Sequence, residues 1–144
     1  MSKNGLVGNH TNSLDSKNRV FFPAKFREEL GSPIVITINP DKCLTAYSAT
    51  EWDNFVGTLV SNSKAKTKEL KRAYCGAAQK VVPDGQGRIM IDKALLNFAG
   101  IEDGITFVGC GDCVELWPES RSPLNALDDA FLAQLSETML ELEI

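Results

Sequence analysis

The sequence predicts an α+β fold in which two similar β-rich halves share one core. The first observation behind this prediction is an internal repeat, because Asp15-Ser-Lys-Asn-Arg19 recurs 69 residues later as Asp84-Gly-Gln-Gly-Arg88. The second is that similar apolar runs, separated by helix-like segments, follow both motifs in the same order. The third is size, since a unit of about 45 residues buries too little surface to be stable alone. The two halves are therefore expected to form a single pseudo-symmetric domain.

Each half is expected to contain a strand, a short helix and two further strands. The segments are 20–22, 23–30, 34–38 and 41–47 in the first half, and 89–91, 92–99, 105–108 and 111–117 in the second. Gly31 and Gly100 follow the two helix-like segments, where a glycine commonly ends a helix. Cys43 aligns with Cys113 in the last strands, which further supports a duplication.

Helices are expected between the halves and at the carboxyl end. Thr50 is predicted to cap one helix, and a second helix is predicted from Lys64 to Ala78. Pro123 suits the first position of an amphipathic helix, whose apolar residues recur at spacings of three and four as far as Leu142. The expected organisation is a first unit at 8–54, a helical connector at 55–76, a second unit at 77–121 and an acidic amphipathic helix at 122–144.

Composition favours an ordinary globular protein, with 43% hydrophobic and 24% charged residues. No stretch approaches the ~20 apolar residues of a membrane span, and the amino-terminal residues lack the apolar run of a secretory signal. We therefore expect a cytoplasmic protein without a membrane partner. In that compartment the four cysteines are expected to be reduced thiols: Cys43, Cys75, Cys110 and Cys113.

Charge is distributed unevenly along the chain, whose formal net charge is −4. Residues 122–144 carry a net charge of −5, whereas residues 1–27 carry +4. The charged residues of the first segment are Lys3, Asp15, Lys17, Arg19, Lys25 and Arg27. This pattern indicates either a local anion-binding surface on an acidic protein or two unrelated solvated surfaces. A further basic cluster is either a solvated helix flank or a DNA contact: Lys64, Lys66, Lys68, Lys71 and Arg72.

The two Asp-x-x-x-Arg motifs are the best candidates for a binding site. An aspartate four residues before an arginine, across a tight loop, can hold the guanidinium in one pose. Asn18 and Gly87 precede the two arginines, and both residue types tolerate the left-handed backbone of such loops. An arginine held in this way suits bidentate contact with guanine or phosphate. The alternative is a purely structural salt bridge that locks the loop.

The sequence shows no catalytic constellation, so we expect neither an enzyme nor a cofactor or metal site. His10, the single histidine, has no obvious carboxylate or nucleophile partner. Cys110-Gly-Asp-Cys113 leaves open a thiol oxidoreductase or a metal site. Its expected place in a hairpin turn, without a second pair of ligands, favours a structural role, with Cys113 in the core.

Four segments together resemble the MraZ family: Leu14–Arg19, Pro23–Leu30, Asp84–Arg88 and Val108–Asp112. The resemblance extends from about Leu6 to about Trp117. It implies two tandem SpoVT/AbrB-like units that form an interleaved, swapped-hairpin β-barrel with peripheral helices. It also implies a ring-like homo-oligomer, associated with the nucleoid, that regulates transcription and typically represses the division and cell-wall gene cluster.

The same resemblance places the DNA contact in the loop from Asp15 to Arg19. Arg19 is then the principal reader of promoter repeats in double-stranded DNA, with Lys17 in support, while Lys25 contacts the backbone. The remaining candidates are Arg27, Asp84 and Arg88, of which the last two are the pseudo-symmetric counterparts. Asn18 departs from the glycine that the family usually has there. Two other functions remain open, namely an assembly protein that binds no DNA and a thiol oxidoreductase.

Overall fold

Eight β-strands form two antiparallel sheets within residues 5–144, the part of the chain that this computed structural model describes. Lys3, one of the basic residues counted above, lies outside this range. The strands are β1 (Asn9–Ser13), β2 (Arg19–Phe21), β3 (Ile34–Asn39), β4 (Cys43–Tyr47), β5 (Gln79–Val81), β6 (Arg88–Met90), β7 (Gly104–Gly109) and β8 (Val114–Pro118). Six of them form one sheet in the order β1-β7-β8-β4-β3-β5, and β2 pairs with β6 in a separate ribbon.

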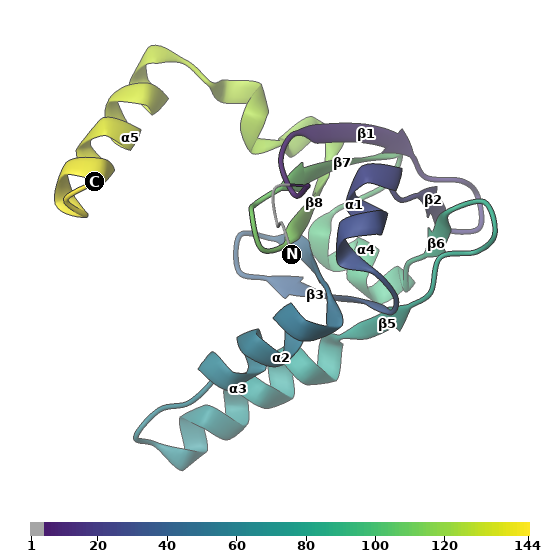
Figure 1. Ribbon diagram of the computed structural model, residues 1–144, viewed down its shortest axis with the longest axis horizontal. Coiled ribbons are helices and arrows are strands. Elements are labelled where there is room, and N and C mark those ends of the chain that lie inside the picture. Colours follow the sequence, from purple (N-terminus) through teal and green to yellow (C-terminus); the bar gives the residue numbers. More distant parts are fainter. Residues whose placement is uncertain (1–4) are drawn as a thin grey trace.

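Five α-helices and two short 3-10 helices complete the fold of the described residues. They are α1 (Ala24–Leu30), α2 (Ala49–Thr58), α3 (Lys64–Ala77), α4 (Lys93–Ala99), α5 (Asp129–Glu141), η1 (Glu119–Arg121) and η2 (Pro123–Ala126). The predicted α+β class is therefore confirmed. Figure 1 shows a β-rich body from which α5 extends at the upper left and the α2–α3 hairpin at the lower left.

The two halves of the chain exchange strands. β1 of the first half pairs with β7 of the second, and β5 of the second pairs with β3 of the first. Val20 lies opposite its counterpart Ile89 in the ribbon, and Thr45 lies opposite its counterpart Glu115 between β4 and β8. Because equivalent residues face one another at both places, an approximate twofold axis passes between the halves.

The expected closed barrel is not formed. Closure would require the two outer strands of the six-stranded sheet, β1 and β5, to pair with each other, and they do not. The chain leaves the sheet after each of these strands and enters the separate β2–β6 ribbon. The sheet is therefore open, and the ribbon crosses the end of the body as a layer of its own (Figure 1).

One hydrophobic core joins both halves. The short helices contribute Phe26 and Leu30 from α1 and Leu95 and Leu96 from α4, all of them buried. Phe22 and Phe107 meet at the centre, with ring centroids 4.9 Å apart. Burial of each such side chain contributes about 1.5–3 kcal/mol. Neither half holds a complete core, because each depends on apolar residues of the other.

The predicted ends of α1 and α4 are confirmed, but the predicted start of α2 is wrong. Gly31 and Gly100 follow α1 and α4 with φ of 71° and 68°, a conformation that favours glycine. Ser48, not Thr50, caps α2, and its side chain accepts a hydrogen bond of 3.1 Å from the Glu51 backbone N–H. Ser48-x-x-Glu51 has the form of a capping box, a signal that the Thr50 assignment overlooked.

The α2–α3 hairpin is attached to the body by an aromatic cluster. Phe55 of α2 stacks on Tyr47 of β4 at 5.2 Å and meets Tyr74 of α3 edge-on at 5.1 Å. The Thr37 hydroxyl donates a hydrogen bond of 2.7 Å to the Tyr74 carbonyl, which ties α3 to β3. Beyond these contacts both helices project away from the sheet.

The carboxyl-terminal helix begins later than expected. Pro123 opens the short η2 turn, and α5 starts only at Asp129, where the Asp128 side chain accepts a 2.9 Å hydrogen bond from the Phe131 N–H. Arg121 anchors the preceding segment by donating to the carbonyls of Lys42 and Ala99.

Across residues 5–144, no helix combines the length and apolarity required to traverse a bilayer.

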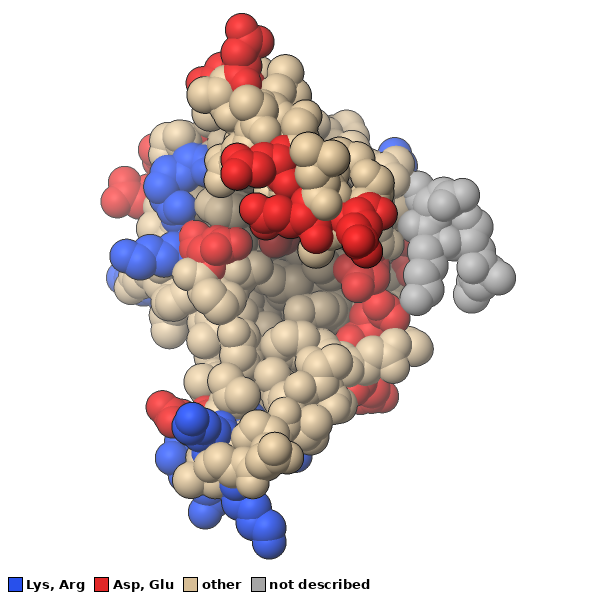
Figure 2. All heavy atoms as spheres, turned by 90° about the vertical axis from the view of Figure 1, so that its left-hand side faces the viewer, with Lys and Arg blue, Asp and Glu red and all other residues tan. Residues whose placement is uncertain are grey.

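Acidic and basic side chains gather in different places. Figure 2 shows one group of Lys and Arg at the lower end of the molecule, over the α2–α3 hairpin, and Asp and Glu over much of the upper part, which includes α5; a second group of Lys and Arg lies at the upper left. The basic end in this view belongs to the separate Lys64–Arg72 cluster, not to the basic residues of the first 27 positions.

Candidate nucleic-acid interface

The first Asp-x-x-x-Arg loop is closed by the carboxylate of Asp15. One oxygen, Oδ1, accepts hydrogen bonds from the backbone N–H groups of Lys17 (2.8 Å) and Arg19 (2.9 Å). The other oxygen, Oδ2, accepts a bond of 2.9 Å from Nε of Arg19. Asp15 and Arg19 also pair through their backbones, since the Asp15 N–H donates to the Arg19 carbonyl at 2.8 Å. The carboxylate therefore holds the turn and the guanidinium together.

The second loop repeats this geometry almost atom for atom. Oδ1 of Asp84 accepts bonds of 2.9 Å from the N–H groups of Gln86 and Arg88, and Oδ2 accepts a bond of 2.9 Å from Nε of Arg88. The Asp84 N–H donates to the Arg88 carbonyl at 2.8 Å. The predicted holding of each arginine by its aspartate is therefore confirmed in both copies.

The charged form of each aspartate is favoured by these bonds. The pKa of Asp15 is lowered chiefly by the Arg19 backbone N–H, with smaller contributions from the Lys17 N–H and the Arg19 guanidinium, against partial desolvation. The pKa of Asp84 is lowered in the same way by Arg88 and Gln86. Both carboxylates are therefore ionised at neutral pH, and each retains its hold on the arginine.

A left-handed residue completes each loop. Asn18 has φ of 62° and Gly87 has φ of 86°, as the sequence predicts for these positions. Gly87 is also under a packing constraint, because a Cβ there would lie 2.7 Å from Cζ of Arg27. The counterpart of Arg27 in α4 is Leu96, which is buried in the core. The first loop thus has no guanidinium at the equivalent place, which accounts for its tolerance of asparagine.

The ribbon carries both arginines on one face. Val20 and Ile89 point into the core, with 1% and 2% of their surface exposed. Because side chains alternate along a strand, Arg19 and Phe21 of β2 share the opposite face with Arg88 and Met90 of β6. Diagonal neighbours on such a face, as Arg19 and Arg88 are here, are about 7–8 Å apart.

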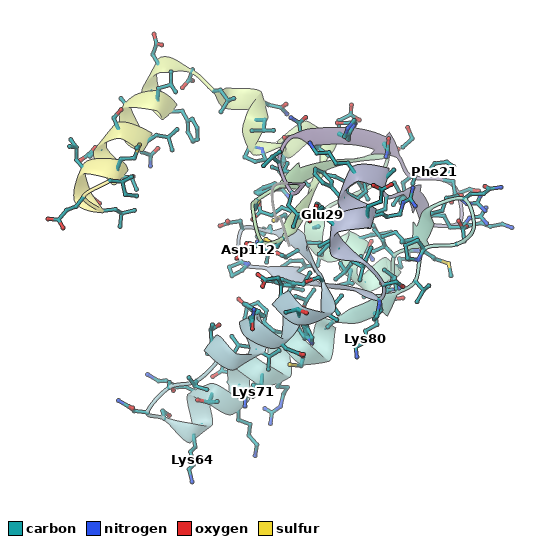
Figure 3. All side chains as sticks on the ribbon, in the orientation of Figure 1. Phe21, Glu29, Lys64, Lys71, Lys80 and Asp112 are labelled. Atoms are coloured by element: carbon teal, nitrogen blue, oxygen red, sulfur yellow. The ribbon has the colours of Figure 1, made fainter. Side chains whose placement is uncertain are left out.

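Phe21 and Met90 are surface residues that the motif reasoning missed. Phe21 is 50% exposed and Met90 60% exposed, although both are large and apolar. The Arg88 guanidinium lies over the Phe21 ring, 5.9 Å from its centroid. Figure 3 shows Phe21 at the end of the molecule where the two loops project, away from α5 and α3. Because side chains alternate along a strand, a buried Val20 places Phe21 on the same exposed face as Arg19, so this position could have been predicted from the sequence.

The guanidinium groups of the two arginines keep a free edge. Only Nε of Arg19 and Nε of Arg88 have protein partners, so within residues 5–144 the terminal Nη atoms of both are unpaired. Two parallel N–H groups on a fixed guanidinium match the acceptors of a guanine edge or a phosphate. The arrangement can therefore bind a planar or anionic ligand without first ordering the side chain.

The other basic candidates lie at different places around the loops. Lys17 is an exposed residue of the first loop. Lys25 is exposed on α1, and its Nζ lies 3.8 Å from the position of a Cβ on Gly8. Arg27 instead packs against the second loop, and its Nε donates a bond of 3.0 Å to the Phe22 carbonyl. Arg27 is thus partly engaged in holding the fold.

The cysteine pair lies in the turn between β7 and β8. Cys110 is exposed and its backbone N–H donates to the Cys113 carbonyl at 2.9 Å. Cys113 is only half-buried, so its expected core position is wrong, whereas its counterpart Cys43 is fully buried. The thiol of Cys113 lowers the pKa of Cys110 by hydrogen bonding to its thiolate, against the nearby charges of Glu115 and Asp112. The pKa of Cys113 is raised by the same contact.

Comparison with known proteins identifies the family. The sequence profile described as "MraZ protein, putative antitoxin-like" matches residues 6–73 and 75–121. A protein of Acetivibrio thermocellus named "Transcriptional regulator MraZ" is 35% identical over 142 residues, which cover 96% of this chain and 99% of that protein. Proteins of the same name from Lachnoclostridium phytofermentans and Caldanaerobacter subterraneus are 34% and 40% identical, over 86% and 78% of this chain and 89% and 80% of their own length. The predicted resemblance is thereby confirmed, and the chain belongs to the MraZ family.

Proposed function

We propose that this protein is a sequence-specific DNA-binding regulator of transcription. In this proposal it represses the division and cell-wall gene cluster as a cytoplasmic, nucleoid-associated protein. The observation that carries the proposal is the pair of loops in which Asp15 and Asp84 hold Arg19 and Arg88 on one face of the β2–β6 ribbon. The names of the relatives support the regulatory role.

The ribbon has a shape that suits a groove of double-stranded DNA. A two-stranded β-ribbon fits the major groove, where a bidentate arginine distinguishes guanine from other bases. Arg19 and Arg88 would supply these contacts, and the exposed Phe21 and Met90 would meet apolar groups such as thymine methyls. Specificity would thus come from both halves of one protomer, with Arg19 as the principal reader.

The basic residues of the first half would fix the protein on the backbone. Lys17 and Lys25 are exposed, and phosphate contacts of this kind position a protein without reading sequence. Arg27 would contribute indirectly, since it packs against Gly87 of the second loop. The acidic helix α5 lies on the other side of the body from the two loops (Figure 1), so its charges are directed away from DNA bound at the ribbon.

Assembly would supply the affinity that one protomer lacks. A single protomer neutralises few phosphates, so its binding should be weak and salt-sensitive. A ring of identical chains would engage several promoter repeats at once, and linked weak contacts become tight through effective concentration. In this proposal 8–54 and 77–121 are SpoVT/AbrB-like units with exchanged hairpins, 55–76 connects them, and 122–144 is a separate acidic segment that contains α5.

The decisive experiment is footprinting of the protein on the DNA upstream of its own gene, with the variant Arg19→Ala beside it. We expect the variant to lose protection of the repeats, because each good bidentate contact contributes about 1–3 kcal/mol of discrimination. Arg88→Ala tests the second loop in the same way. Lys80→Ala, which removes one exposed positive charge from β5, is the control and should footprint normally.

Normal protection by Arg19→Ala would remove the assigned role. If the wild-type protein bound no genomic fragment even at low salt, an assembly protein without a DNA function would be favoured instead. A reporter driven by the protected promoter separates repression from activation, and we expect its output to fall when the protein is supplied.

A further inference from the structure

The apolar side of α5 has no partner within the chain. Every residue of the helix except Phe131 is exposed, including Leu132, Leu135 and Met139. These residues, with Leu142, recur at spacings of three and four and therefore form one stripe along the helix. An isolated helix of 13 residues is marginal in water, so its stability calls for a surface that covers this stripe.

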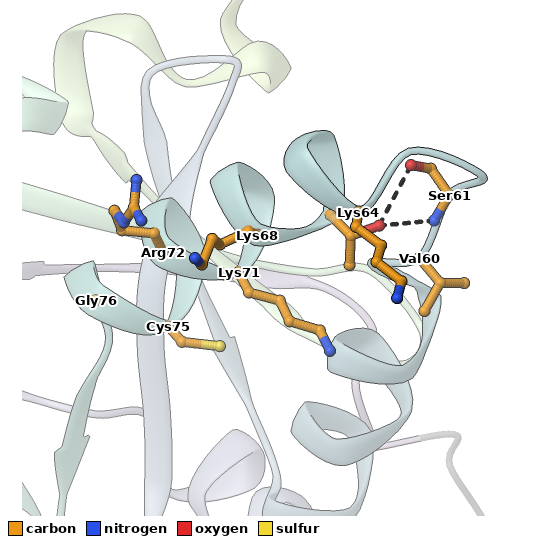
Figure 4. Close-up of a pocket in the computed structure, with 9 residues that line it drawn as sticks. Val60, Ser61, Lys64, Lys68, Lys71, Arg72, Cys75 and Gly76 are labelled. Atoms are coloured by element: carbon orange, nitrogen blue, oxygen red, sulfur yellow. Dashed lines mark hydrogen bonds between the residues drawn. The ribbon is translucent and has the colours of Figure 1, made fainter.

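The α2–α3 hairpin offers a surface of matching character. A groove of about 840 Å³ runs along α3 and is lined by Val60, Cys75 and Gly76 together with basic side chains. The basic residues in its lining are Lys64, Lys68, Lys71 and Arg72. Figure 4 shows the long side chains of Lys64 and Lys71 extending from α3 on the side of Val60 and Cys75, with Arg72 pointing to the other side. Such stems present apolar methylene groups to a ligand and keep their charges at the rim.

The charges of the two surfaces are complementary. Every charged residue after Arg121 is acidic: Asp128, Asp129, Glu137, Glu141 and Glu143. Two α5 helices would therefore repel each other, whereas α5 against the α3 groove pairs acids with lysines. A nucleic acid in the groove would neutralise the lysines but leave the apolar stripe of α5 in water. Of these three pairings, only α5 against the groove both covers the apolar stripe of α5 and neutralises the lysines.

We propose that α5 of one copy of this chain docks into the α2–α3 groove of the next copy. Both α5 and the hairpin that carries the groove extend from the same side of the body, α5 above and the hairpin below (Figure 1). α5 is joined by two residues to the anchored η2 turn. Because donor and acceptor are different surfaces, the contact is head-to-tail, and repeated head-to-tail contacts close into a ring when the rotation allows. The inference rests on the self-association in the proposed function and names the surfaces that perform it.

The test compares neighbouring substitutions in the full-length protein by measuring mass against concentration, without DNA. Met139→Glu places a charge in the stripe, and Leu140→Glu places the same charge on the adjacent, more exposed residue outside it. Lys71→Glu alters the groove, and Lys66→Glu alters α3 outside the groove. We expect Met139→Glu and Lys71→Glu each to raise the concentration needed for assembly by about tenfold or more, and the two controls to assemble normally.

Three results would overturn the inference. If all four variants assembled like the wild type, the ring would use other surfaces. If Lys71→Glu weakened only DNA binding while Met139→Glu changed nothing, the groove would bind nucleic acid. If Met139→Glu left the mass unchanged but reduced hydrogen-exchange protection of α5, the helix would dock on its own chain. Assembly is measured here without DNA and operator binding by footprinting, so failure of one proposal is distinguishable from failure of the other.

Discussion

Asp15 and Asp84 each fix the backbone of their loop and the orientation of the arginine that ends it. In each loop a single carboxylate accepts two backbone N–H groups and one guanidinium N–H, so the loop cannot open without releasing the arginine. A single side chain thus controls both the local fold and the candidate site. Changes at this scale should therefore affect stability and binding together.

The first prediction concerns acid. A carboxyl group with a lowered pKa stabilises the fold fully above the pKa of the unfolded chain, and this stability is lost as the pH falls through the lower pKa of the folded state. Asp15 and Asp84 are both of this kind. Asp15→Asn/Asp84→Asn should therefore be less stable than the wild type at neutral pH, with the difference shrinking below pH 3.8, the ordinary value. Urea unfolding across this range measures it, and a pH-independent difference would contradict the assignment.

The two left-handed positions provide a matched pair of substitutions. Gly87→Ala adds a Cβ against Arg27 at a φ of 86°, so we expect it to lower the free energy of unfolding by about 1–2 kcal/mol. Asn18→Gly removes a side chain from a similar conformation and should leave stability equal or slightly higher. Chemical denaturation of both variants measures their free energies of unfolding against that of the wild type. Wild-type stability of Gly87→Ala would show that Arg27 moves away freely.

At the scale of single elements, local signals located most helices but not all of their ends. α1, α3 and α4 follow the expected segments because periodic apolar residues and terminal glycines are properties of the local sequence. α5 departs from expectation because Pro123 begins a 3-10 turn and Asp128 provides a separate cap further on. Pro123 and Asp128 are both residues that commonly start a helix, and the apolar periodicity alone does not show which of them starts α5.

The corrected start of α2 can be tested by two alanine substitutions. Ser48→Ala removes the side chain that accepts the Glu51 N–H, and its expected cost is about 1 kcal/mol of stability. Thr50→Ala, two residues later, should have almost no effect, since the Thr50 hydroxyl has no capping role. Thermal unfolding of the two variants compares them directly. A larger loss for Thr50→Ala would restore the original expectation.

At the scale of the whole molecule, the exchange of strands makes the halves interdependent. β3 needs β5 of the second half, and β1 needs β7. We therefore expect a chain ending at Ala78 to lack cooperative unfolding and a dispersed amide spectrum, while the full chain shows both. A folded, cooperative fragment would mean that each half completes its own sheet in isolation.

The candidate site also belongs to this scale. The sequence contained the two loops and their arginines, but it did not place them beside each other. That proximity arises because β2 and β6, far apart in the chain, pair in one ribbon with Val20 opposite Ile89. The same pairing brings Phe21 under the Arg88 guanidinium, a contact between halves that no local pattern contains.

The sequence by itself determined the duplication, the two carboxylate-held turns, the glycine helix ends and the family, because each depends on residues within one turn or one recurring motif. The tertiary structure alone decided that the sheet stays open, that both arginines share one face, that Cys113 lies outside the core and that α5 stands uncovered. These features depend on which distant segments pair and on what remains exposed afterwards. Such pairing is settled by the joint burial of apolar surface from both halves, and no single segment carries that information.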